Sequence, residues 1–150
     1  MKKVLFVCIG NCIRSQMAEG FALKYGGDVI QAFSAGLAPA GYVSEIASKL
    51  MAERGISLEN HVSKSIPEVP GAPYDLVVNI SGEPFAVRGL AAEMRVWNVA
   101  DPMGKKEPAY QEAVQQIENL VMSLILELRR PNTAAKRPAT TGRQTPGQRR

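Results

Sequence analysis

Short apolar runs alternate along this chain with longer stretches whose apolar residues recur every three or four positions. The short runs are rich in Val, Ile, Leu and Phe, and they predict strands at residues 3–8, 29–35, 74–80 and 94–99. The longer stretches predict amphipathic helices at residues 15–25, 43–54 and 110–129. Strands that alternate with helices favour a parallel sheet that is covered on both faces. The sequence therefore predicts an α/β domain.

Small and polar residues set the expected ends of two helices. Ser15 is expected to cap the first helix, and the pair Gly26-Gly27 is expected to end it. Gly55 is expected to stop the second helix.

The length and composition fit one folded domain. A chain of 150 residues is long enough for one hydrophobic core, and its apolar content of 45% is close to that of globular proteins. No stretch approaches the roughly 20 apolar residues of a membrane helix, and no signal peptide is evident, so we expect a cytoplasmic protein without a membrane partner. Two cysteines and one histidine argue against a disulfide framework and against a His-based metal site.

Charge divides the chain into two regions. Residues 129–150 hold seven Lys and Arg and no acid, which leaves eleven bases against fourteen acids over residues 1–128. We expect the mildly acidic region 1–129 to be the folded domain, which the motifs described below make the candidate catalytic domain. The segment 130–150 is rich in Pro, Thr and Arg and has no large apolar side chain, so we expect it to be disordered. A weak electrostatic contact of this basic tail with an acidic partner is an alternative to a tail without a specific role.

The loop after the first predicted strand carries the main candidate chemistry. It reads Cys8-Ile9-Gly10-Asn11-Cys12-Ile13-Arg14-Ser15 and leads from a buried strand to a helix N-terminus. The first amides of a helix are unpaired and carry partial positive charge, so a loop wrapped there forms an anion cradle. Gly10 allows a tight turn, Asn11 tolerates left-handed backbone angles, and Arg14 offers a planar fork that matches two phosphate oxygens. Residues 9–14 are therefore predicted to bind phosphate.

Cys8 lies at the base of this predicted cradle. The loop amides, the helix dipole and Arg14 favour its thiolate form, and a thiolate that faces a phosphoryl group is placed for in-line attack. Such an attack gives a phosphocysteine. Ser15, at the start of the helix, is expected to donate a hydrogen bond to the sulfur. On the residues alone, an ordinary buried cysteine with Arg14 at the surface remains an alternative.

A resemblance to a known family begins in residues 4–20. This segment contains Cys-Ile-Gly-Asn-Cys-Ile-Arg-Ser-Gln-Met-Ala-Glu-Gly and resembles the low-molecular-weight protein tyrosine phosphatase family, especially its arsenate-reductase branch. The segments Ser34-Ala35-Gly36, Gly55-Ile56, 61–66 and Asp101-Pro102 resemble later parts of that family, so the resemblance covers about residues 3–128.

The resemblance implies a fold, a site and a substrate class. The implied fold has three α/β/α layers, with a central four-stranded parallel sheet and a phosphate-binding loop after the first strand. No metal or organic cofactor is implied. The implied substrate is a phosphotyrosine protein or a small phosphate ester, with inorganic phosphate or arsenate as product or competing ligand.

Asp101 is the candidate for a second catalytic group. It follows the fourth predicted strand, and the strand-end loops of a parallel sheet lie at the same edge as the predicted cradle. Breaking a phosphate ester needs a proton donor, and hydrolysis of the intermediate needs a base; one carboxyl group can serve both steps. The resemblance implies this role for Asp101, whereas the residues alone also allow a turn-forming Asp before Pro.

The sequence departs from the family pattern in three respects. The family's second loop cysteine usually precedes the arginine directly, but here Ile13 stands there and Cys12 lies one residue earlier. Cys12 is thus a candidate redox partner of Cys8 or an inert small residue. No cysteine follows Cys12, so the relay of the thioredoxin-coupled arsenate reductases lacks its later thiols. Aromatic residues do not follow the Asp-Pro pair, which leaves Tyr42 as a candidate substrate wall or an ordinary surface residue.

Three functions follow from these residues. The leading prediction is a phosphomonoester hydrolase of the protein tyrosine phosphatase type, with Cys8 as nucleophile, Arg14 as phosphate ligand and Asp101 as acid and base. One alternative is an arsenate reductase that depends on an external thiol. Another is a non-catalytic phosphate-binding module. His61, which lies in a polar loop, is expected to be a hydrogen-bonded structural residue instead of a base.

Overall fold

The computed structural model describes residues 1–130, so the predicted tail from residue 131 onward lies outside the described residues. The sheet has four parallel strands: β1 (Lys2–Cys8), β2 (Ile30–Gly36), β3 (Leu76–Asn79) and β4 (Met94–Val96). Their order is β2-β1-β3-β4, and Val4 of β1 pairs with Ala32 on one side and Leu76 on the other. Because β1 is central and covered on both faces, its residues 4–8 are all buried and apolar.

The strand order places a crevice at one edge of the sheet. The chain leaves β1 for β2 on one side and then crosses back to β3 on the other side. In parallel α/β sheets, ligands bind outside the carboxyl ends of the strands at such a reversal. The loop at residues 9–13 follows the carboxyl end of β1 and therefore lies at this crevice.

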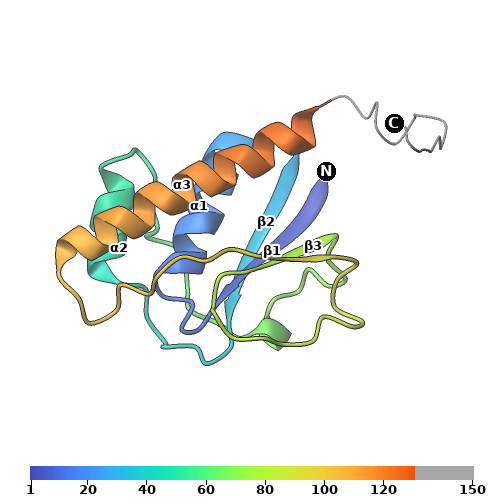
Figure 1. Ribbon diagram of the computed structural model, residues 1–150, viewed down its shortest axis with the longest axis horizontal. Coiled ribbons are helices and arrows are strands. Elements are labelled where there is room, and N and C mark those ends of the chain that lie inside the picture. The colour runs from blue at the N-terminus through green and yellow to red at the C-terminus, as the bar shows by residue number, and fades with distance from the viewer. Residues whose placement is uncertain (131–150) are drawn as a thin grey trace, which may run out of the picture.

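Three α-helices cover one face of the sheet (Figure 1). They are α1 (Arg14–Gly26), α2 (Glu45–Ala52) and α3 (Glu107–Arg129). Their buried side chains form one core with Val4 and Phe6 of β1, and Phe21 of α1 lies wholly inside it. Helices α1 and α3 pack so closely that a Cβ atom on Gly26 would lie 2.6 Å from Cγ1 of Ile125. This packing fixes α1 and, with it, the loop that leads into α1.

The opposite face is covered by the short 3₁₀ helix η1 (Ile66–Glu68) and by connecting segments. Leu5 and Val7 of β1 are buried on this face, with Phe85 and Leu90 from the segment between β3 and β4 packed against their cluster. The predicted fold class, a central sheet of four parallel strands with a covering layer on each face, is confirmed. The layer on this face consists of η1 and connections instead of long helices.

Two element ends differ by three residues from those predicted, and the other ends differ by two residues at most. Helix α3 begins at Glu107, three residues before the predicted start, with Pro108 in its first turn. Pro suits the first turn of a helix but adds nothing to an apolar stripe, so periodicity did not reveal this turn. Strand β4 ends at Val96 instead of residue 99. Within residues 1–130, no helix combines the length and the apolar character that are needed to cross a membrane.

Ser15 does not cap the first helix. It is the second residue of α1, and Ile13 holds the cap position without a side-chain hydrogen bond. The Ser15 hydroxyl is therefore available to the loop, and its partners there are described below.

Candidate active site

The loop between β1 and α1 turns sharply. Asn11 has a φ of 49°, a left-handed conformation that Asn adopts more readily than most residues. Strand β2 approaches the loop so closely that a Cβ atom on Gly36 would lie 2.7 Å from the Ile9 carbonyl oxygen and 2.9 Å from Asn11 N. The end of β2 therefore needs a glycine, and its backbone supports the loop directly.

The carbonyl groups of the loop all accept hydrogen bonds from outside it. For residues 8 to 13 in turn, the donors are Leu37 N, Ala38 N, Ala40 N, Gln16 Nε2, Ser44 N and Met17 N, at 2.8 to 3.1 Å. Among the described residues, the amides of residues 10–14 meet no hydrogen-bond acceptor. Unpaired amides in a tight loop before a helix N-terminus form an anion-binding site.

Cys8 ends β1 and is buried beside these amides. Ser15 Oγ lies 2.9 Å from the Cys8 sulfur, and Ser15 N lies 3.5 Å from it. Asn11 Nδ2 donates to Ser15 Oγ at 2.7 Å, so the hydrogen of the Ser15 hydroxyl is free to point at the sulfur. The sulfur therefore has a hydroxyl group and a backbone amide of the same residue beside it.

Arg14 is the first residue of α1 and is only 4% exposed. Its Nη1 donates to the carbonyl oxygen of Ile80 at 2.7 Å and to that of Val99 at 3.0 Å. Ile80 follows β3 and Val99 follows β4, so the guanidinium is held between two strand ends. Its Nη2 lies 3.4 Å from Oδ2 of Asp101. The plane of the guanidinium is thus fixed before any ligand arrives.

Asp101 lies in the connection between β4 and α3. Its side chain is 46% exposed, and its Oδ1 accepts a hydrogen bond from Met103 N at 3.0 Å. The other oxygen faces Arg14, as described above. The carboxyl group therefore stands at the edge of the cradle with access to water.

These groups line one cavity of about 170 Å³. Its lining consists of residues 8–10 and 12–14 together with Ala38, Ala40, Asp101 and Met103. The structure thus brings the predicted nucleophile, phosphate ligand and acid together. Tyr42 does not belong to this lining, and its side chain is 56% exposed. The sequence did not single out Ala38, Ala40 and Met103, which are apolar residues of the lining.

Cys12 lines the same cavity as a buried thiol. The pKa of the Cys12 thiol is raised to about 11, mainly by burial and also by the neighbouring Cys8 and Asp101, while Arg14 lowers it. Both Cys8 and Cys12 are free thiols. Cys12 is therefore protonated at neutral pH and is a weak nucleophile there.

Sequence reasoning missed the groups that hold the cradle from outside. The carbonyls of Ile80 and Val99, which anchor Arg14, are backbone atoms and have no sequence signal. Gln16 is a wholly buried polar residue whose amide contacts the loop. The one sequence signal for this role of Gln16 was its position in the motif that resembles the family.

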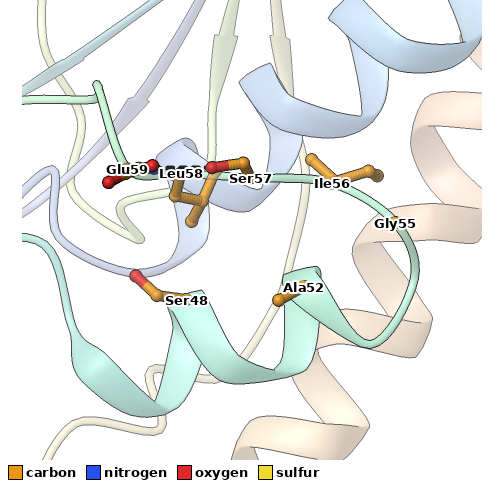
Figure 2. A pocket seen from close by; sticks show the side chains of 7 residues that line it. All are labelled: Ser48, Ala52, Gly55, Ile56, Ser57, Leu58 and Glu59. Atoms are coloured by element: carbon orange, nitrogen blue, oxygen red, sulfur yellow. Dashed lines mark hydrogen bonds between the residues drawn. The ribbon is translucent and has the colours of Figure 1, made fainter.

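A second cavity, of about 460 Å³, lies between α2 and residues 55–59 (Figure 2). Ser48 and Ala52 line it from α2, and Glu59 is the only titratable residue among residues 1–130 that lines it. This cavity has neither a thiol nor a cationic group. Within residues 1–130, no group of three or more His, Cys, Asp and Glu side chains is arranged to hold a metal ion.

Similarities to known proteins extend over most of the chain. Residues 3–134 match the family described as low molecular weight phosphotyrosine protein phosphatase. Arsenate reductase 2 of Staphylococcus epidermidis is 33% identical over 125 residues, which are 81% of this chain and 95% of that protein. A solved structure described as an arsenate reductase in the phosphate binding state is 32% identical, with a TM-score of 0.77 over 85% of this chain and 99% of that one. A tyrosine phosphatase of Erwinia amylovora is 26% identical, with a TM-score of 0.68 over 87% of this chain and 95% of that one.

Proposed function

Because the chain belongs to the low molecular weight phosphotyrosine protein phosphatase family, we propose that it hydrolyses phosphate monoesters through a phosphocysteine on Cys8. The observation that carries the proposal is the shared cavity: the sulfur of Cys8, Arg14 and Asp101 line it, beside a loop with unpaired amides. The proposed substrates are the phosphotyrosine of a protein or a small phosphate ester.

In the first proposed step, the amides of residues 10–14 and Arg14 bind the phosphoryl oxygens. The Cys8 thiolate attacks phosphorus, and the bond between phosphorus and the ester oxygen breaks. Asp101 gives its proton to the departing oxygen, so the product leaves as a neutral alcohol or phenol. The donors that surround the phosphoryl group stabilise the charge that develops on it.

In the second proposed step, a water molecule attacks the phosphorus of the phosphocysteine. Asp101, now a carboxylate, takes a proton from this water, and the bond between sulfur and phosphorus breaks. Inorganic phosphate leaves, and Cys8 returns to the thiolate form. The half-exposed position of Asp101 supports this role, because the group meets both the cavity and water.

The test is hydrolysis of an aryl phosphate by reduced protein between pH 5 and 7. Replacing the nucleophile in Cys8→Ser should abolish turnover. Asp101→Asn should lower kcat by a factor of about 100 or more, because the leaving oxygen loses its proton donor. Asp28→Asn is the matched control, since Asp28 is a similarly exposed carboxyl that pairs with Arg129 outside the site. Wild-type protein without any ester turnover would rule the proposal out.

A second candidate function is the reduction of arsenate, which the names of similar proteins favour. Arsenate resembles phosphate and would form an adduct with the Cys8 sulfur in the same cradle. Its reduction to arsenite takes two electrons, which two thiols supply when they form a disulfide. Cys12 is the only other thiol of the chain, and its raised pKa makes it a poor donor. An external thiol would therefore have to release arsenite and leave a mixed disulfide on Cys8.

Arsenate and the aryl phosphate should be assayed side by side, with glutathione, mycothiol or a glutaredoxin system as the thiol donor. Arsenite formation that needs both Cys8 and the added thiol would select the reductase. Stabilisation of the fold by phosphate, without turnover of either substrate, would select a phosphate-binding module on the same fold.

A further inference from the structure

Gln16 is a buried polar residue that the proposed mechanism does not use. It is the third residue of α1, and its side chain has no exposed surface. Its Nε2 donates to the carbonyl oxygen and to Oδ1 of Asn11, both at 3.1 Å, and to the carbonyl oxygen of Val62 at 2.9 Å. Its Oε1 lies 2.8 Å from Nδ1 of His61. One amide thus joins the loop to the segment around residue 61.

These contacts determine the direction of the Gln16 amide. Two backbone carbonyl oxygens face one end of it, and because they only accept, that end must be the NH₂ group. The other end is then the oxygen, so Nδ1 of His61 carries a hydrogen and donates to it. Glu19 Oε1 lies 3.8 Å from the same His61 nitrogen, which is too far for a competing hydrogen bond.

The hydrogen-bond partners of Asn11 determine the orientation of its side-chain amide in the same way. Its Oδ1 accepts from Gln16 Nε2 and from Lys64 N, the latter at 3.0 Å. Its Nδ2 therefore faces the other side and uses both hydrogens, at 2.7 Å to Ser15 Oγ and 3.0 Å to Ser34 Oγ. Since Ser15 Oγ already accepts, its own hydrogen is left for the Cys8 sulfur at 2.9 Å.

We propose that Gln16 is a positioning residue for the Cys8 sulfur. It directs a chain of hydrogen bonds that runs from His61 through Gln16, Asn11 and Ser15 and ends in a donor to that sulfur. Without the Gln16 amide, Lys64 N alone would hold the Asn11 oxygen, and the Asn11 side chain that directs the Ser15 hydroxyl would be held less firmly. This inference rests on the proposed role of Cys8 as the nucleophile.

The test measures the reactivity of the Cys8 sulfur instead of turnover. Gln16→Met keeps the length and burial of the side chain but removes its hydrogen bonds. The rate of alkylation of Cys8 by iodoacetamide, followed by mass spectrometry of its peptide, gives the pH at which the thiol is half-reactive. We expect this midpoint to rise by about one pH unit, the size expected for loss of one hydrogen bond to the thiolate. The other titratable side chains of the cavity, Cys12, Arg14 and Asp101, are unchanged in this variant.

A double-mutant cycle separates positioning from general loosening. If Gln16 acts through Ser15, then Gln16→Met should change the midpoint much less in a Ser15→Ala background than in the wild type. Equal shifts in the two backgrounds would overturn the proposal. So would an unchanged midpoint in folded Gln16→Met protein.

Two control variants address stability and surface effects. Ile125→Val loosens the packing between α1 and α3 far from the loop, and Gln115→Met removes an exposed amide of α3. Neither should shift the midpoint of Cys8. If Ile125→Val shifts it as much as Gln16→Met does, positioning by Gln16 is excluded.

A measurement on the unaltered protein covers the case in which Gln16→Met does not fold. The ¹⁵N chemical shifts of neutral His61 should show the hydrogen on Nδ1, because Gln16 Oε1 is an acceptor. A hydrogen on Nε2 alone would overturn the proposal. Ordinary, unenhanced reactivity of Cys8 in the wild type would instead count against the proposed function, so the two failures are distinguishable.

Discussion

Arg14 and Cys12 belong to the same loop and are buried to almost the same extent, 4% and 2% exposed, but their surroundings differ. The charge of Arg14 is met by two carbonyl oxygens and by Asp101. At Cys12, burial and the nearby Cys8 and Asp101 outweigh the lowering effect of Arg14 on the pKa, so the thiol stays protonated at neutral pH. Burial therefore preserves charge at one residue and suppresses it at the other.

Arg14→Lys should weaken both the site and the fold. Lysine keeps the charge but loses the planar fork that reaches two carbonyls while facing a phosphate. Loss of about two charged hydrogen bonds predicts a fall in kcat/KM for an aryl phosphate of 100-fold or more and a lower Tm. Arg95→Lys is the control, because Arg95 pairs with Glu93 and Glu127 on the surface, where such pairs contribute little. Equal effects of the two variants would contradict this account.

The Cys12 thiol should make stability fall at alkaline pH. Its pKa is about 11 in the folded protein against an ordinary value of 9.0, so between these pH values the folded state binds more protons than the unfolded state. Stability is then fully present below pH 9 and is lost as the pH rises through 11, by up to about 3 kcal/mol. Urea unfolding at pH 8, 10 and 11 should show this extra loss in the wild type but not in Cys12→Ala. Parallel curves for the two proteins would disprove it.

At the scale of elements, hydrogen bonds and contacts from neighbouring elements hold the loop at residues 9–13 in place. Residues 37, 38 and 40, which follow β2, supply amides to the carbonyls of residues 8–10, and Gly36 at the end of β2 lies close to the loop backbone. Helix α1 supplies Arg14 and Gln16, and its position is fixed by α3. The unpaired amides are therefore available in the free protein, without a cost of ordering when a ligand binds.

Gly36→Ala should displace the loop. The added methyl group would lie 2.7 Å from the Ile9 carbonyl oxygen and 2.9 Å from Asn11 N, so the backbone must move. We expect destabilisation by about 1–3 kcal/mol and a loss of aryl phosphatase activity in the protein that remains folded. Gly27→Ala, where the nearest atom is 3.4 Å away, should leave activity unchanged. Phosphate affinity by calorimetry reports the loop directly, and unchanged affinity in Gly36→Ala would refute the displacement.

At the scale of the whole molecule, the end of helix α3 lies at one end of the sheet and the candidate active site lies at the other. The C-terminal end of α3 lies beside the amino end of β1, where Leu128, Met1 and Lys2 line a shared hollow. Arg129 Nη2 holds this end of α3 in place by donating hydrogen bonds to the Tyr25 carbonyl oxygen and to Oδ1 of Asp28, at 2.7 Å each. The candidate active site lies at the carboxyl end of β1, roughly 20 Å away for a strand of seven residues. The chain therefore enters its last 20 residues far from the site.

Truncation after Arg130 should leave the domain intact. The described elements and both cores lie within residues 1–130, and the sequence beyond has no large apolar side chain to add to them. We expect Tm within about 1 °C of the full chain and unchanged kcat/KM for an aryl phosphate. The affinity for a polyanion at low salt should fall, because five basic residues are removed. A Tm several degrees lower would show that the tail packs on the domain.

The sequence predicted the fold and the composition of the site where local chemistry is decisive. The apolar runs of β1 and β3 and the stripe of α3 follow from burial, and the loop with Cys8, Gly10 and Arg14 follows from its place between a strand and a helix. The family resemblance drawn from that loop is confirmed. The roles of Cys8, Arg14 and Asp101 remain predictions that the variants above test.

Only the tertiary structure decided which residues hold the site in place and which line its cavity. These contacts join residues that are far apart in the chain. Arg14 donates hydrogen bonds to the carbonyl oxygens of Ile80 and Val99, which lie 66 and 85 positions away in the sequence. Asn11 accepts a hydrogen bond from Lys64 N, which lies 53 positions away. Every residue type has a backbone carbonyl, so no sequence pattern could have predicted these contacts. The lining of the cavity by Met103, and the position of Tyr42 outside it, likewise depend on how separate connections meet at one edge of the sheet.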